Sequence, residues 1–237
     1  MRHHSTVDRP PALFFAGRSC YAPASGIFPH SMGELKQYRA GTVAPKTEGN
    51  PEGKGLNGFL LDWYRSEPRG VVAKPQRQVL AEFFTSMLVL SASFKYEPAV
   101  GVRNYLYCID GEWSLSLIAP EEWTEARRAG FVGTCVLQHD MTWTIAPSKL
   151  LAEDNAVSEA VGRFYDAFAE SLDTDLTLEE ILPFHAGKMP YYQRLYASAL
   201  SRSIRAAVTL SGQRSASSRE WRLALPRLER VMLVRKD

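Results

Sequence analysis

The chain has 237 residues, of which 45% are apolar and 11% aromatic, and a formal net charge of +2 at pH 7. This composition is typical of a globular protein of one large or two small domains and excludes a disordered tail. No apolar run approaches the roughly 20 residues of a transmembrane helix, so no membrane partner is expected. The cysteines (Cys20, Cys108 and Cys135) are odd in number and widely spaced, which favours a reducing, cytoplasmic location over a disulfide framework.

Proline and glycine punctuate residues 1–74, which predicts an irregular segment with one or two short elements. Within it, Gly53-Lys54-Gly55 superficially suggests a phosphate-binding loop. The spacing to the preceding glycine does not fit a Walker motif, and Gly55 stands where a hydroxyl residue belongs. We interpret the stretch as a loop, in which Lys54 and Asn57 are candidates for contact with a nucleic-acid backbone or groove.

An α+β core is predicted for residues 75–147. Pro75 suits the first turn of a helix, and apolar residues recur at spacings of three and four through residues 75–91. This pattern predicts a helix with one wide apolar face. Pro98 and Gly101 are expected to end that element.

Residues 102–145 predict four short antiparallel strands that pack on this helix. Asp110-Gly111 is typical of a tight hairpin turn, because it accepts positive φ angles. In the strand that follows, Trp113, Leu115 and Leu117 alternate with serines, so all three are expected on one buried face. His139-Asp140 is interpreted as the turn of the second strand pair.

Residues 148–237 predict a helical C-terminal domain with a basic end. An amphipathic helix is expected from about Leu150 to Leu172, and the capping-box pattern at 177–180 predicts a short helix. A long helix is expected over 191–210. The final segment, 219–235, is interpreted as helical with an interruption at a proline.

Charge is distributed very unevenly along this last part. Residues 151–187 hold nine acids and one base, whereas residues 188–237 hold eleven bases and three acids. Nine of these eleven bases are arginine, whose planar guanidinium suits phosphate. A basic segment of this density predicts a polyanion or an acidic protein as its partner.

Three of the arginines are expected on one face of the 191–210 helix, since Arg194, Arg202 and Arg205 fall within about 80° around the axis. Helical arginines spaced in this way could contact successive phosphates. Two alternatives stay open: the acidic and basic segments could pair internally, or the arginines could form a solvated or protein-binding surface. The other candidate phosphate contacts are Lys188, Arg219 and Arg222.

No pattern in the sequence predicts catalysis, a metal or a cofactor. Zinc requires clustered cysteines and histidines, and the cysteines here are far apart. Gly17-Arg18-Ser19-Cys20-Tyr21 is not a nucleophile elbow. Cys20 could form a catalytic dyad with a distant histidine, but the same holds for any cysteine and histidine in a sequence. The sequence therefore predicts a non-enzymatic protein.

One resemblance is local. The residues that carry it are Tyr105 to Tyr107, Ser116 to Trp123, Phe131 to Gly133 and Leu137 to Trp143. Together they resemble the domain of unknown function 2452 family over about residues 94–145. This resemblance implies no catalytic residue, and it leaves the N-terminal segment and the C-terminal helices unexplained.

A second resemblance is looser and covers more of the chain. It rests on the order of an irregular N-terminal third, Phe59 to Tyr64, Trp113 to Pro120, Phe131-Val132, Gln138-His139, Trp143, Pro147 and a helical tail. This order is similar to the compact large-subunit protein of type IV CRISPR effector complexes. Members of that family carry paired zinc-finger cysteines in the N-terminal half, where this chain has only Cys20 and the distant Cys108. The resemblance implies a non-catalytic subunit of an antiviral ribonucleoprotein complex that touches the end of a guide RNA and helps to read a short motif on target DNA.

The leading expectation is thus a non-enzymatic subunit that binds RNA or DNA, with other protein subunits docked on its strand region. The alternative is a protein–protein adaptor built on the strand region, in which the acidic and basic helices pair with each other and nucleic acid plays no part.

Overall fold

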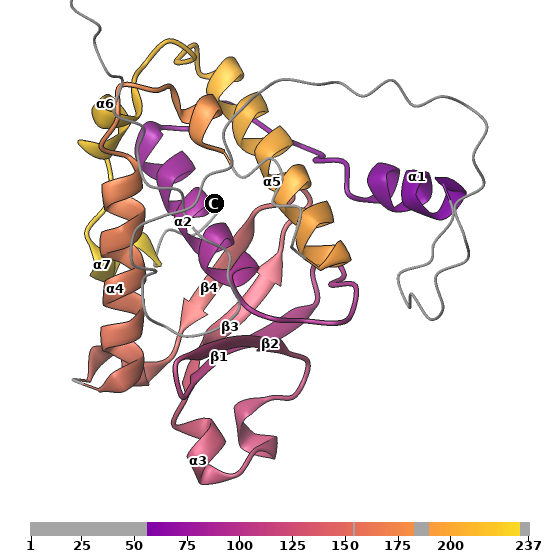
Figure 1. The fold of residues 1–237 in the computed structure, drawn as a ribbon, viewed down its shortest axis with the longest axis vertical. Coiled ribbons are helices and arrows are strands. Elements are labelled where there is room, and N and C mark those ends of the chain that lie inside the picture. Colours follow the sequence, from indigo (N-terminus) through magenta and orange to yellow (C-terminus); the bar gives the residue numbers. More distant parts are fainter. Residues whose placement is uncertain (1–55, 154, 183–189, 233–237) are drawn as a thin grey trace, which may run out of the picture.

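The computed structural model describes residues 56–153, 155–182 and 190–232. The fold is α+β, as predicted: a four-stranded antiparallel sheet is packed on helices, and helices follow it to the C-terminal side (Figure 1). Within these ranges no helix combines the length and the apolar character that crossing a bilayer requires.

Helix α2 (Gln76–Leu90) is the central element of the core. Every residue from Val79 to Leu90 is buried, including Glu82 and two hydroxyl residues. Figure 1 shows α4 (Ala156–Ser171) and α5 (Tyr191–Leu210) on the two sides of α2, with the sheet beneath it. The predicted bounds of α2 are confirmed, but its apolar face is wider than expected because neighbours cover it all round.

The sheet has the order β2-β1-β3-β4, and all its pairs are antiparallel. Asp110 and Gly111 join the first two strands with φ angles of 49° and 81°, so the predicted tight turn is confirmed. Leu117 contradicts the expectation of burial, since its side chain is 56% exposed beyond the end of its strand. The strands are β1 (Arg103–Ile109), β2 (Glu112–Ser116), β3 (Phe131–Leu137) and β4 (Trp143–Pro147).

The remaining elements are short. The helix expected from about Leu150 begins later, because Asn155 caps α4 by accepting hydrogen bonds from the backbone amides of Val157 and Ser158. The capping box at Thr177 is confirmed, with Glu180 accepting from the Thr177 amide at 2.8 Å. These elements are α1 (Leu56–Arg65), η1 (Pro120–Glu122), α3 (Glu125–Arg128), η2 (Lys149–Ala152), η3 (Leu178–Ile181), α6 (Ser218–Arg222) and α7 (Leu228–Val231).

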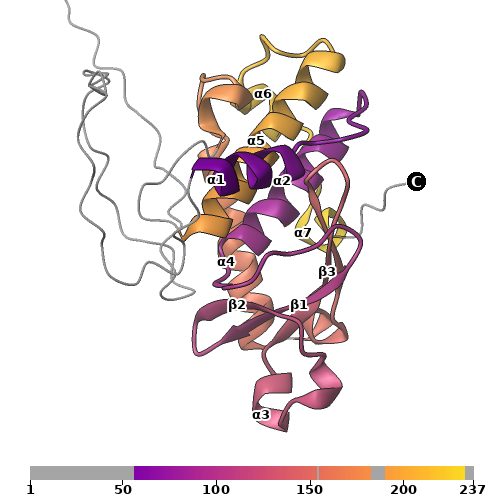
Figure 2. The same cartoon turned by 90° about the vertical axis from the view of Figure 1, so that its right-hand side faces the viewer.

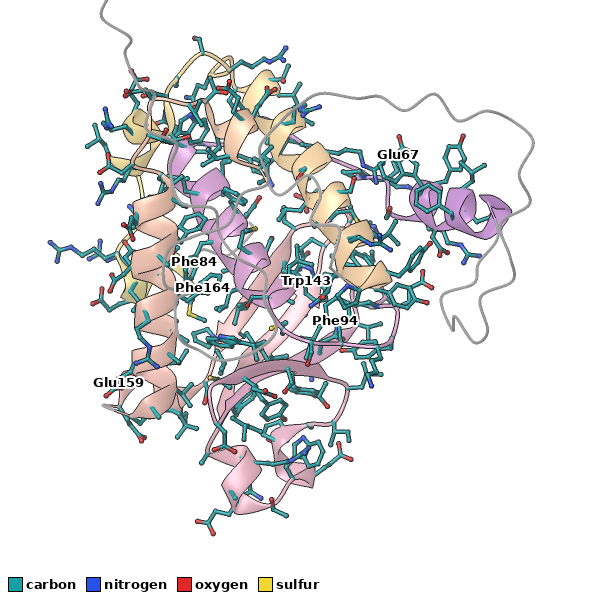
Figure 3. The ribbon with its side chains drawn as sticks, in the orientation of Figure 1. Glu67, Phe84, Phe94, Trp143, Glu159 and Phe164 are labelled. Atoms are coloured by element: carbon teal, nitrogen blue, oxygen red, sulfur yellow. The ribbon has the colours of Figure 1, made fainter. Side chains whose placement is uncertain are left out.

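One hydrophobic core joins the strand region to the C-terminal helices. The ring of Phe168 on α4 lies 5.2 Å from that of Phe83 and 5.5 Å from that of Phe84, both edge-on. In Figure 3, Phe84 and Phe164 face each other between α2 and α4, and their ring centroids are 5.8 Å apart. The core thus crosses the predicted boundary between residues 147 and 148, where the chain changes from strands to helices.

A buried cluster of charges lies inside this core. The ammonium of Lys74 is 2.5 Å from Glu82 Oε2 and 2.8 Å from Asp140 Oδ2, and all three side chains are at most 6% exposed. Thr142 donates from its amide and its hydroxyl to Asp140 Oδ1. Burial alone would lower the pKa of Lys74, but the hydrogen bonds and charges of the two carboxylates outweigh it and raise that pKa. The cluster joins the segment before α2, α2 itself and the β3–β4 turn.

Candidate nucleic-acid interface

Helix α5 has the predicted bounds, but its three candidate arginines have different environments. Arg194 is half-buried and forms no ion pair with any residue in the described part of the chain. Arg205 is 47% exposed, and its Nε lies 3.5 Å from Glu179 Oε2. Lys54, Lys188 and the side chain of Asn57 lie outside the described residues. No common phosphate-facing role of the three arginines is therefore visible from their contacts.

Arg202 holds α1 against α5. Its guanidinium lies over the indole of Trp63, 4.1 Å from the ring centroid, and Nη2 donates to the carbonyl and the hydroxyl of Ser66 at 2.9 and 3.1 Å. Burial lowers the pKa of Arg202, and the charge of Glu67 partly opposes this. Figure 2 shows α1 crossing in front of the helical body. Arg202 thus serves as an intramolecular contact between α5 and the α1 region.

The acidic and basic segments form a network of ion pairs. Arg219 binds Asp173 at 2.9 Å and Asp175 at 2.6 Å, and Arg222 binds Asp173 at 2.9 Å. Arg214 binds Glu179 at 2.9 Å. We call the acids of this network (Asp173, Asp175 and Glu179) and its bases (Arg205, Arg214, Arg219 and Arg222) the ionic clamp. The alternative of internal pairing thus has direct geometric support for these arginines.

The clamp is close to solvent, which limits its strength. Its arginines are 43–62% exposed and Asp175 is 85% exposed. Pairs of this exposure contribute little each and are screened by salt. The hydrogen bond from Arg219 lowers the pKa of Asp173. The negative charge of Asp173 therefore stabilises the fold at neutral pH, and this contribution is lost only as the pH falls below the ordinary aspartate pKa of about 3.9. At neutral pH a competing polyanion would have to displace these carboxylates.

A second group of arginines has no acidic partner within the described residues. Arg227 and Arg230 lie on or beside α7, and Arg77 lies in the first turn of α2. All three are exposed, and they line one pocket. Arg227 and Arg230 belong to the arginine-rich C-terminal segment, but neither was among the candidate phosphate contacts predicted from the sequence. Arg77 was missed, because it is 150 residues away from Arg227 in the sequence.

The described residues contain no group of three or more histidine, cysteine, aspartate or glutamate side chains that could hold a metal ion. Cys135 is fully buried in β3, and burial raises the pKa of its thiol, so it is not poised as a nucleophile. The considered dyad of Cys20 lies outside the described residues.

Comparison with known protein families yields a match over part of the chain. Residues 71–165 match the family described as "Protein of unknown function (DUF2452)", which supports the local resemblance of the strand region and extends it over α2 and most of α4. No curated protein and no solved structure matches the chain. The matched region contains Arg77 and the buried Lys74 cluster but none of the C-terminal arginines.

Proposed function

We propose that this protein is a non-enzymatic, nucleic-acid-binding subunit of a ribonucleoprotein complex. The observation that carries the proposal is a group of arginines without an acidic partner. Three carboxylates of the ionic clamp meet four arginines, while Arg194, Arg227 and Arg230 have no acidic partner among the described residues. Internal pairing therefore accounts for only part of the basic surface, and the remainder attracts a polyanion.

Guanidinium groups suit this role because their planar donors match two oxygens of one phosphate. Contacts of this type hold the backbone of RNA or DNA and carry no base specificity. The finer proposal is a subunit of a CRISPR-type effector that contacts the end of a guide RNA and target DNA in antiviral defence. It rests on the order of sequence features alone, and the family match does not bear on it.

Binding of a short RNA and of a DNA duplex across a salt series tests the proposal. We expect the logarithm of the association constant to fall linearly with the logarithm of the salt concentration. The variant Arg194→Gln/Arg227→Gln/Arg230→Gln should reduce the slope by about 0.7–0.9 for each phosphate contact that is lost. Fluorescence anisotropy measures both quantities.

A matched control removes three positive charges elsewhere. Lys95→Gln/Arg103→Gln/Lys149→Gln changes the net charge equally, at exposed side chains that make no ion pair with the described residues. It should keep most of the wild-type affinity and slope. Absence of wild-type binding at low salt would overturn the proposal. If both variants lose the same affinity and slope, the C-terminal arginines are not the binding site.

A second candidate function is a protein–protein adaptor, favoured by the ionic clamp itself and by an exposed apolar pair. Leu117 and Ile118 follow β2, which is an edge strand, and their side chains are 56% and 40% exposed. Exposed aliphatic residues beside a sheet edge suit a protein partner. In this candidate the clamp is structural and the docking surface is the strand region.

Charge reversal tests whether the ion pairs of the clamp stabilise the fold. Reversing its three acids to arginine, or its four arginines to glutamate, places like charges within about 4 Å and should lower the melting temperature. Reversing both sides together should restore most of that loss. Failure of the combined variant to recover would mean that the pairs do not hold the helices together.

A further inference from the structure

A pocket of about 650 Å³ lies where the first turn of α2 meets the connection between α6 and α7. Its lining consists of Arg77, the segment 223–227 and Arg230. The volume lies within the range of pockets that hold small ligands. The arginines therefore converge on one concavity from two parts of the chain.

The walls of this pocket are fixed by the core. Trp221, which lies in α6 just before the connection, is fully buried. Tyr165 donates a hydrogen bond from its hydroxyl to the carbonyl of Pro226 at 2.9 Å, and the amide of Leu225 donates to the carbonyl of Arg222 at 3.0 Å. A preformed wall lowers the ordering cost of binding a ligand.

The electrostatic character of the pocket is positive. Arg77, Arg227 and Arg230 form no ion pair with a described residue, although Glu229 is exposed nearby on α7. The first turn of α2 contains no acid, so the positive end of the dipole of this 15-residue helix adds to the charge of Arg77. The complementary ligand group is a phosphate.

The pocket also has an apolar part. The side chain of Leu223 is 89% exposed, more than that of any other large apolar residue in the described part of the chain. The half-buried Ala224 and Leu225 and the buried Pro226 also line the pocket. Guanidinium groups beside an exposed leucine match a ligand that joins a phosphate to a flat, weakly polar ring.

We propose that this pocket binds one nucleotide unit, with its phosphate held by Arg77, Arg227 and Arg230 and its base packed on Leu223. This inference rests on the proposed function, because it assigns one contact of the bound strand to a defined site. A free mononucleotide has the same chemistry and is the other possible source of the ligand.

Two single variants test the pocket with a 5′-phosphorylated single-stranded RNA in a salt series. Leu223→Ser should weaken binding about tenfold without changing the salt slope, because it removes apolar contact and no charge. Arg77→Gln should weaken binding and reduce the slope by about 0.7. The exposed Leu117→Ser serves as the matched control for Leu223→Ser and should bind as the wild type does.

The outcomes separate this inference from the proposed function. If the wild type binds RNA with a steep salt dependence, but Leu223→Ser and Arg77→Gln bind equally well, the pocket is overturned and the proposed function survives. If the wild type binds no strand, calorimetry with adenosine 5′-monophosphate and with inorganic phosphate decides. Binding of the mononucleotide that is lost in Leu223→Ser would support the pocket. Absence of mononucleotide binding, or equal affinity for inorganic phosphate, would overturn it.

Discussion

Replacement of Lys74 by methionine should lower the free energy of unfolding by about 3–5 kcal/mol, because the change leaves two buried carboxylates without their cation. Lys74 donates to Glu82 and Asp140 in the intact protein. Chemical denaturation at pH 7 measures the loss. It should shrink as the pH falls, since the folded variant would protonate these carboxylates more readily than the unfolded chain does.

The control for this prediction removes the charges together. The variant Lys74→Met/Glu82→Gln/Asp140→Asn keeps side chains of similar volume and should recover much of the lost stability. For the wild type, the raised pKa of Lys74 means that its contribution is present below about pH 10.4 and declines only above that value. A Lys74→Met variant within 0.5 kcal/mol of the wild type, taken as roughly the usual effect of a surface change, would contradict the prediction.

The variant Phe168→Ala should lower the free energy of unfolding by a similar amount, about 3–5 kcal/mol. The ring of Phe168 is fully buried on α4 and packs edge-on against Phe83 and Phe84 of α2. Because this contact joins the two predicted domains, we expect one cooperative transition at a lower temperature. Calorimetry measures both its midpoint and its shape.

Leu210→Ala is the control for Phe168→Ala. Leu210 is also a large apolar residue on a long helix, but it is 57% exposed. This variant should change stability by no more than about 0.5 kcal/mol. A separate low-temperature transition in Phe168→Ala, with the rest of the protein unaffected, would instead indicate that residues 148–237 fold as an independent unit.

Local patterns predicted the elements of this fold well. Apolar spacing placed α2 within a residue of its observed ends, and Asp110-Gly111 identified the first hairpin. The predicted bounds of α5 also agree with the structure. The buried charge cluster was not predicted, because Lys74 and Asp140 are 66 residues apart. The one sequence signal was Glu82, which interrupts an otherwise apolar stretch of α2.

The candidate site was predicted less completely. Helical angles placed three arginines on one side of α5. Such angles carry no information about which neighbouring residues each guanidinium contacts. Trp63 and Ser66 engage Arg202, and Glu179 engages Arg205. Long-range packing also brings Arg77 to the C-terminal arginines. Such convergence depends on tertiary structure and leaves no pattern in the sequence.

The burial of α2 on every side has a consequence for synthesis of the chain. Helix α2 is complete at Leu90, whereas α5, which covers one of its sides, ends roughly 120 residues later. At usual translation rates this interval lasts on the order of ten seconds. During that time the side of α2 that α5 covers remains exposed on the nascent chain, even after the sheet and α4 have been made. Chaperones that recognise apolar segments would therefore have their main opportunity before α5 emerges.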